Sequence, residues 1–281
     1  MKKIKWKDIK IILLILACVL FVVDGAYLWI TTSKTSDHIK ASEHIAQVNV
    51  EKINFISGND YFVKYPPNTV YAIDEAVENG FESVLLDVRL TKDKKWVCFK
   101  DESLLEATGQ EGNVRDYTYF DLLKFSLKKK EEEMTTPVIN LLDEVLKKCA
   151  ENAVLPIIYV HTPQEIESLI EILKNTSMIS DATVMMENYD SLVDFSQKYP
   201  NIKTLYRVST VDSVVIDSLR MIENGTVCFD GSLEDNDAEM LLTLKENKYN
   251  FSCYNVNEPE RLKLYTSIGA VNIITDKYIP Q

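Results

Sequence analysis

From Ile53 onward, short apolar runs alternate with stretches whose apolar residues recur at helical spacing. The short runs are typical of buried strands, and they lie at 53–57, 83–88, 95–99, 154–160, 182–186, 202–207, 226–229, 250–254 and 271–275. Alternation over roughly 230 residues favours a (β/α)8 TIM barrel, whose usual size is about 250 residues. A doubly wound open sheet is the alternative, but no G-x-G-x-x-G motif follows the first strand.

Local signals mark several element ends. Apolar residues on one face predict a helix over 69–79, which Gly80 terminates. Residues 91–95 join two strands too tightly for a helix and predict a hairpin-like turn. The segment 162–165, Thr-Pro-Gln-Glu, combines an N-cap, a proline and a capping-box glutamate, so it predicts a helix start.

The N-terminal region predicts a membrane anchor. Residues 11–30 are apolar apart from Asp24, which is long enough to cross a bilayer. Five lysines precede this run, so the N-terminus is expected in the cytoplasm. The predicted organisation is a cytoplasmic tail at 1–10, a transmembrane signal anchor at 11–31, a stalk at 32–52 and an extracytoplasmic barrel at 53–281.

Two other fates of this region are open. A cleaved secretory signal is one, although small residues at cleavage spacing are poor. Lipoprotein processing at Cys18 is the other, although the sequence stays apolar after that cysteine. The single-pass anchor in the cell membrane is therefore the favoured interpretation.

Charge and cysteine usage exclude some classes of function. The formal net charge is −12, which argues against nucleic acid as a partner. The five cysteines form no C-x-x-C pair, so a zinc site is not expected. Cys98, Cys228 and Cys253 lie in strand-like apolar runs, which favours buried free thiols. An oxidising compartment would permit a disulfide, but the spacing does not indicate one.

A motif at 83–104 carries a family resemblance. It reads SVLLDVRLTKDKKWVCFKDESL. It resembles the second and third strands of glycerophosphodiester phosphodiesterases, whose pattern is E-x-D-V-x-L-T-K-D-G, an apolar strand and then H-D-x-x-L. Further segments resemble the family's P-E-N-T motif, its P-x-L-x-E-x-L and S-F-D segments, and its W-T-V-N and G-V-D-x-I-I-T-D motifs, at 65–69, 137–146, 188–200, 254–259 and 269–276. The resemblance covers about 53–280 and implies a TIM barrel.

The resemblance implies hydrolysis of glycerophosphodiesters to an alcohol and glycerol 3-phosphate. In that chemistry strand-end carboxylates hold a divalent metal, and two histidines act as acid and base. The first family histidine falls on Ser57, or on Gly58 if the loop is one residue shorter. The second falls on Lys100, which cannot easily act as a base unless burial depresses its pKa.

The metal ligands that the resemblance implies are also replaced. Leu85 and Pro67 stand where the family has glutamates, and a third glutamate falls on Tyr159 or Ile158. Only Asp87 keeps a ligand's residue type, so it is the candidate metal ligand. One carboxylate is too few for a hard divalent cation, so no cofactor is expected. Calcium or magnesium would be implied if the site is active.

The remaining candidates are residues of a ligand pocket at the strand ends, where barrel active sites are built. Lys100 could pair with Asp87 or Asp101 in place of a metal, or hold a phosphate as a point charge. Tyr254 stands at a family tryptophan and could stack on a ligand. The full set of pocket candidates is Asp87, Lys100, Asp101, Tyr159, His161 and Tyr254.

These replacements favour a membrane-anchored pseudoenzyme that binds or scaffolds. Its expected ligand is a glycerophosphodiester or an envelope phosphopolymer, and a membrane protein is a further partner. The alternative is an active phosphoric diester hydrolase of lipid or envelope-polymer metabolism, with a cation site rebuilt from Asp60, Asp87, Asp101 and Glu102. A third hypothesis is a purely structural contact with another envelope protein.

Overall fold

The computed structural model describes residues 53–62, 64–128, 136–233, 238–247 and 249–277. In this part of the chain, eight parallel strands close into a barrel because β1 pairs with both β2 and β9. The ninth strand, β3, pairs antiparallel with β2 at the edge. The predicted TIM barrel is therefore confirmed, and the open-sheet alternative is wrong. The strands are β1 Asn54–Ser57, β2 Ser83–Leu90, β3 Trp96–Cys98, β4 Leu155–Val160, β5 Thr183–Met186, β6 Lys203–Val208, β7 Gly225–Asp230, β8 Phe251–Tyr254 and β9 Asn272–Thr275.

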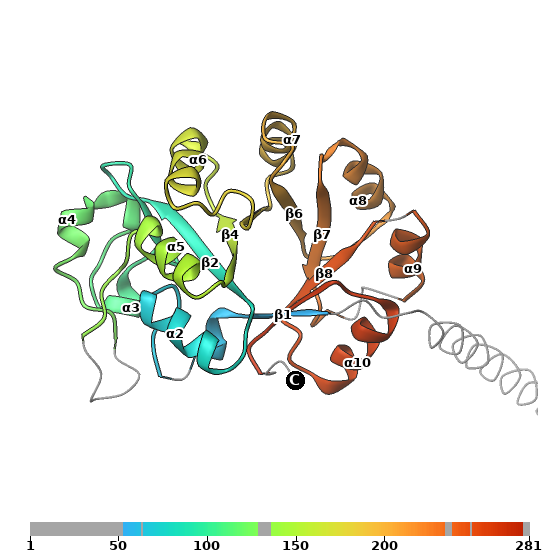
Figure 1. The fold of residues 1–281 in the computed structure, drawn as a ribbon, viewed down its shortest axis with the longest axis horizontal. Helices are drawn as coiled ribbons and strands as arrows, with labels where there is room; N and C mark the ends of the chain where they lie inside the picture. The colour runs from blue at the N-terminus through green and yellow to red at the C-terminus, as the bar shows by residue number, and fades with distance from the viewer. Residues whose placement is uncertain (1–52, 63, 129–135, 234–237, 248, 278–281) are drawn as a thin grey trace, which may run out of the picture. The chain divides into compact units, whose positions relative to one another are not determined.

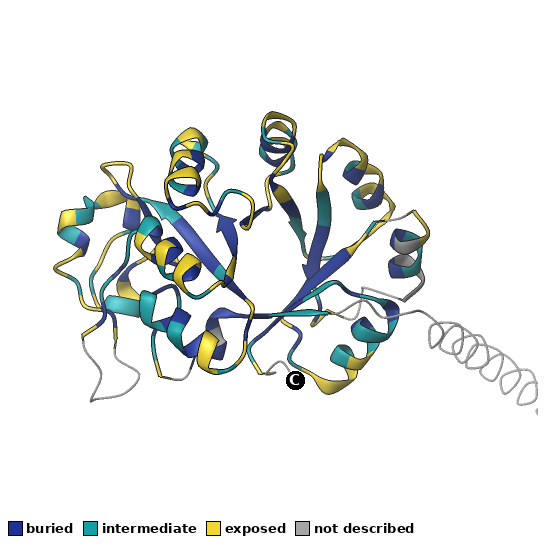
Figure 2. Ribbon diagram, viewed as in Figure 1, coloured by how far each residue is buried: buried dark blue, intermediate teal, exposed yellow. Residues whose placement is uncertain are grey.

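Helices lie outside the ring of strands and follow them in chain order (Figure 1). The longer helices, such as α2, α5, α6 and α7, have both buried and exposed residues, as the burial colours show (Figure 2). This is the pattern expected when each strand–helix unit covers the outer face of the barrel. The helices are α2 Val70–Glu78, α3 Leu105–Thr108, α4 Tyr119–Leu122, α5 Leu142–Glu151, α6 Ile166–Asn175, α7 Tyr189–Lys198, α8 Ser213–Ser218, α9 Ala238–Glu246 and α10 Pro259–Ile268.

Alternation along the strands divides the core into two parts. One set of side chains fills the barrel interior, namely Ile56, Ile157, Tyr159, Met185, Leu205, Cys228, Tyr254 and Ile274. Their neighbours along each strand, such as Val84, Leu86 and Ile158, are buried between strand and helix. Because the strand period is two, a residue's parity decides whether its side chain faces the barrel axis.

The connection after β2 follows the sequence prediction. Residues 91–95 form a tight turn in which the Lys95 amide donates to Thr91 Oγ1 at 2.9 Å. Lys94 adopts a left-handed φ of 58° at this turn. The segment between β3 and α5 then carries α3 and α4 over a small apolar cluster of its own, which includes Phe99, Leu104, Val114, Leu122 and Leu127.

The predicted helix start at 162–165 is wrong. Helix α6 begins at Ile166, and Glu165 precedes it with a left-handed φ of 53°. Two contacts lie beside this helix start: Lys94 of the β2–β3 turn pairs with Glu165, and Trp96 Nε1 of β3 donates to Ser168 Oγ at 2.9 Å. The local capping signal at 162–165 therefore does not start the helix.

Cys98, Cys228 and Cys253 are buried and free, as predicted, and Cys149 is buried and free as well. Burial raises the pKa of Cys149 and of Cys228 to about 12, so these thiols are protonated at neutral pH.

The predicted tail at 1–10, anchor at 11–31 and stalk at 32–52 lie outside the described residues. Among the helices that the structure does describe, none has the length and apolar character needed to cross a bilayer.

Candidate functional site

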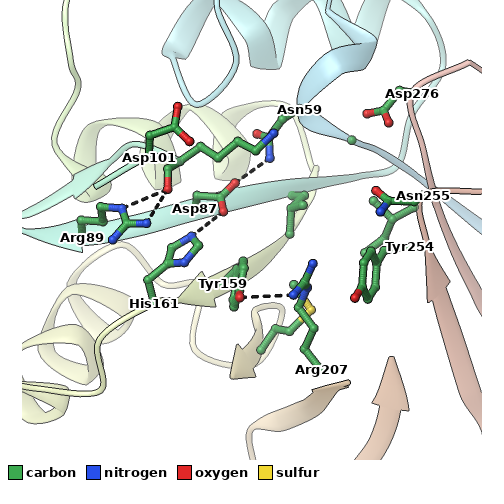
Figure 3. Close-up of a pocket in the computed structure, with 15 residues that line it drawn as sticks. Asn59, Asp87, Arg89, Asp101, Tyr159, His161, Arg207, Tyr254, Asn255 and Asp276 are labelled. Atoms are coloured by element: carbon green, nitrogen blue, oxygen red, sulfur yellow. Dashed lines mark hydrogen bonds and ion pairs between the residues drawn. The ribbon is translucent and has the colours of Figure 1, made fainter. Parts of the chain in front are cut away.

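A pocket of about 280 Å³ lies at the carboxyl ends of the barrel strands. Its polar side chains converge from opposite sides of the ring (Figure 3). In a TIM barrel this face carries the ligand site. The lining residues are Gly58, Asn59, Leu85, Asp87, Arg89, Lys100, Asp101, Tyr159, His161, Met185, Arg207, Tyr254, Asn255, Ile274 and Asp276.

Asp87 is the centre of a hydrogen-bond network on one side of the pocket. Its side chain is buried, and its Oδ1 lies 2.6 Å from His161 Nε2. Asn59 Nδ2 donates to the other oxygen, Oδ2, at 2.6 Å. Asn68 connects Asn59 to the Asp87 backbone. Its Nδ2 donates to Asn59 Oδ1 at 2.9 Å, and its Oδ1 accepts from the Asp87 amide at 2.8 Å. Both carboxylate oxygens of Asp87 therefore have protein partners.

Local structure explains how these residues meet. Asn59 lies in a single 3-10 turn, Asn59–Tyr61, directly after β1. Asn68 has a φ of 63°, a conformation that asparagine tolerates better than most residues. Thr69 then caps α2 by accepting from the Ala72 amide. The loop before α2 thus places the Asn68 side chain against Asp87 within β2.

Arg207 lies across the pocket from Asp87. Its guanidinium carbon is 3.9 Å from the ring centroid of Tyr254 and 5.0 Å from that of Tyr159, so the cation is held by two rings. It also pairs with Glu187. Burial raises the pKa of Tyr254 to about 12, and burial is also the main reason that the pKa of Tyr159 is raised. Both phenols are therefore neutral at physiological pH.

Arg89 lies near Lys100 at the same mouth. Its Nε and Nη2 donate to the Lys100 carbonyl oxygen at 2.9 and 2.7 Å. Burial lowers the pKa of Arg89, and the nearby carboxylates of Asp87, Glu102 and Asp101 oppose that effect. The pocket thus combines cationic side chains with the Asp87 network.

The structure brings all six predicted pocket candidates to this one pocket. Ser57 lies elsewhere: its side chain is fully buried outside the pocket lining, and its Oγ has no hydrogen-bond partner among the described residues. Its neighbour Gly58 lines the pocket instead. Of the two positions considered for the strand-four glutamate, Tyr159 faces the pocket, and Ile158 is buried but absent from its lining.

The carboxylates of the rebuilt cation site do not all gather. Asp87 and Asp101 line the pocket, whereas Glu102 pairs with Arg115 at 3.2 Å. The side chain of Asp60 lies outside the described part of the structure. Within the described part, no group of three His, Cys, Asp or Glu side chains is arranged to hold a metal. Leu85 and Tyr159 offer no carboxylate, and both oxygens of Asp87 already have protein partners. The other carboxylates in the pocket lining are Asp101 and Asp276.

Sequence reasoning missed Arg207, Arg89, Asn59, Asn255 and Asp276. One signal was available for Arg207. It follows Leu205 by two residues on β6, and Leu205 belongs to the barrel interior. An arginine at an inward position near a strand's carboxyl end is a pocket residue by parity alone.

Comparison with known proteins agrees with the fold. The model of the glycerophosphoryl diester phosphodiesterase family matches residues 61–279. The chain belongs to this family. A glycerophosphodiester phosphodiesterase of Caldanaerobacter subterraneus is 27% identical over 219 residues, which are 75% of this chain and 88% of that enzyme. One from Bacillus altitudinis is 40% identical over 84 residues, which span 30% of this chain and only 34% of that enzyme's length.

Solved structures of the family share the barrel. An Oleispira antarctica phosphodiesterase, determined in complex with the product sn-glycerol-3-phosphate, aligns with a TM-score of 0.72 and 22% identity over 79% of this chain and 92% of that one. A Thermotoga maritima glycerophosphodiester phosphodiesterase aligns with a TM-score of 0.65 and 22% identity over 81% and 96%. At this level of identity the likeness establishes the fold.

Proposed function

We propose that this protein binds glycerophosphoryl ligands at the barrel mouth and has lost the metal-dependent hydrolysis of its family. The observation that carries the proposal is that each oxygen of the Asp87 carboxylate has a hydrogen-bond partner, Asn59 for Oδ2 and His161 for Oδ1. A metal at Asp87 would compete with these buried hydrogen bonds, and Leu85 and Tyr159 supply no carboxylate where the family has glutamates. Protein hydrogen bonds thus replace the coordination that the family fold implies.

The ligand class follows from the charges of the pocket. Arg207 and Lys100 line it together with Arg89, so a small anion has cationic partners without a metal. A family member has been determined with sn-glycerol-3-phosphate, which supports a ligand of this kind. The pocket volume of about 280 Å³ suits a glycerol phosphate group.

A hydrolase with a rearranged site is the alternative function. The specific observation in its favour is the contact between His161 Nε2 and Asp87, because a carboxylate that orients an imidazole is a usual arrangement for a general base. Asp101 lines the same pocket and could add a carboxylate. The hydrolase hypothesis and the binding hypothesis predict different results when turnover and ligand binding are measured on the same sample.

The test uses the full chain in a non-ionic detergent. Release of glycerol 3-phosphate from glycerophosphodiesters is measured with Ca²⁺, Mg²⁺, Mn²⁺ or EDTA, and calorimetry measures binding of sn-glycerol 3-phosphate under the same conditions. We expect binding that EDTA does not weaken and no turnover. Asp87→Asn, which keeps the side-chain shape, is the key variant, and Asp121→Asn on exposed helix α4 is its control.

Three outcomes separate the hypotheses. Turnover that requires both a metal and Asp87 would overturn the proposed loss of catalysis and establish the rearranged site. Binding without turnover would support the proposal. A folded sample that neither binds nor hydrolyses these compounds would contradict the ligand assignment and favour a scaffolding role with a membrane protein partner.

We also propose that residues 11–31 anchor the protein in the cell membrane with the barrel outside the cytoplasm. Support comes from the length of the apolar run and the five lysines before it. Before protease treatment, the barrel should be found in the membrane fraction. Protease added to intact spheroplasts should then degrade it. If the barrel resists protease until the cells are lysed, it lies in the cytoplasm and the proposed topology is wrong. Release of the barrel into the medium would indicate a cleaved signal.

A further inference from the structure

Arg207 is held in a fixed orientation by its neighbours. The rings of Tyr254 and Tyr159 pack against the guanidinium at 3.9 and 5.0 Å, and Nη1 lies 3.5 Å from the Tyr159 hydroxyl. Stacking uses the faces of the guanidinium, whereas its hydrogen-bond donors lie along the edge. Only 24% of the Arg207 side chain is exposed, so the cation is ordered before any ligand arrives.

The Glu187 carboxylate is the anion that pairs with the guanidinium of Arg207. It follows the last residue of β5 directly, and its carboxylate pairs with Arg207 Nη1. The Tyr159 side chain hydrogen-bonds to the same glutamate. Glu187 thus has two partners at the pocket mouth, one a cation and one a phenol.

The two members of the pair differ in their surroundings. The Glu187 side chain is 55% exposed, more than twice the exposed fraction of Arg207. A half-exposed carboxylate can turn to water and be hydrated there, because exposed ion pairs contribute little free energy. Arg207 cannot leave without breaking both ring contacts. An incoming anion would therefore replace the glutamate and meet the arginine where it already lies.

We propose that Arg207 and Tyr159 form an anion-binding position that Glu187 occupies as an internal counter-ion, and that the phosphoryl group of a ligand binds there by displacing Glu187. The inference rests on the proposed function for its ligand class. A phosphoryl group presents oxygens that match the fork of an arginine in the way a carboxylate does, with more negative charge. Glu187 then lowers the affinity for weaker anions by competing with them.

The test measures binding of inorganic phosphate and of sn-glycerol 3-phosphate to the full chain in detergent by calorimetry. Glu187→Gln removes the competing charge, and we expect it to tighten phosphate binding by about threefold to tenfold. Arg207→Gln removes the cation, and we expect it to weaken binding of both compounds by about tenfold or more. Thermal unfolding verifies that each variant is folded.

Matched controls come from exposed ion pairs outside the pocket. Glu167→Gln breaks the pair with Lys198 on the helical surface, and Arg220→Gln breaks the pair with Asp217. Neither change should alter phosphate binding. A change of equal size in a control would mean that net charge, and not this position, governs the affinity.

Two results would overturn the inference. One is folded Glu187→Gln that binds phosphate no better than the unaltered protein, which would make the pair structural. The other is sn-glycerol 3-phosphate binding that Arg207→Gln leaves unchanged, in which case the proposed function stands and this position fails. Conversely, phosphate binding that depends on Arg207 while glycerophosphoryl compounds do not bind would keep the anion position and overturn the proposed function.

Discussion

Gly58 has no room for a side chain. A β-carbon built at this residue would overlap Asp276 Oδ1 and approach the Thr275 carbonyl. The Asp276 carboxylate is held in place, because Asn257 Nδ2 donates to it at 2.9 Å and the Asp276 amide donates to Asn257 Oδ1 at 2.8 Å. The backbone of Gly58 is extended, with φ −76° and ψ 171°, so its restriction is steric and not conformational.

We expect Gly58→Ala to lower the free energy of unfolding by about 1–3 kcal/mol, because Asp276 must move to admit the methyl group. Asp276→Ala should remove most of that loss when the two changes are combined. Denaturant unfolding of both single variants and the double variant gives the coupling between them. Additive effects would show that another contact, such as the Thr275 carbonyl, sets the restriction.

At the scale of elements, the start of α2 couples a helix cap to the pocket. Thr69 Oγ1 donates to the Pro66 carbonyl at 2.8 Å and accepts from the Ala72 amide at 3.3 Å. The buried Glu75 carboxylate, further along the helix, accepts from the Lys64 and Tyr65 amides at 3.1 Å. These bonds fix the loop that presents Asn68 to Asp87.

Thr69→Ala should destabilise the protein by about 1 kcal/mol, within the range of about 0.5–2 kcal/mol for a lost N-cap. Thr69→Ser keeps the hydroxyl and serves as the matched control, so its loss should be smaller. Urea unfolding measures both. If the alanine variant is as stable as the serine variant, the hydroxyl does not contribute to the cap.

At the scale of the whole molecule, buried and half-buried tyrosines make the fold sensitive to alkali. Burial raises the pKa of Tyr119, Tyr254 and Tyr265 from 10.0 to about 12. The unfolded chain loses these protons near pH 10 and the folded chain only near pH 12. Between those values the folded state binds more protons, so its stability must fall as pH rises.

We expect the free energy of unfolding to be maintained up to about pH 10 and to decline from there towards pH 12. Denaturant unfolding at several pH values measures the slope, and phenolate absorbance of the folded protein should appear late. Tyr265→Phe removes one of these groups, whose hydroxyl donates to the Gly231 carbonyl at 3.1 Å, and should flatten the slope. A slope that this variant leaves unchanged would contradict the assignment.

Much of this molecule can be predicted from local patterns. The strand runs and helix stripes predict the barrel, and the motif at 83–104 predicts the family and places Asp87, Lys100 and Asp101 at the mouth. These predictions succeed because periodicity and chain order fix which residues form strands and which strand ends meet. The hairpin-like turn at 91–95 is predicted for the same reason, since five residues cannot contain a crossover helix.

Other features depend on contacts between distant residues. His161 and Asp87 are separated by 74 positions, and nothing local shows that their side chains bond. The choice of Gly58 over Ser57 depends on strand parity at the barrel axis. Glu165, which precedes α6 with a left-handed φ, pairs with Lys94 of the distant β2–β3 turn. Sequence alone determined the barrel, its family and six of the residues at its mouth. Tertiary structure decided how those residues pair, because hydrogen bonds, ring stacking and ion pairs depend on distances that sequence spacing does not fix.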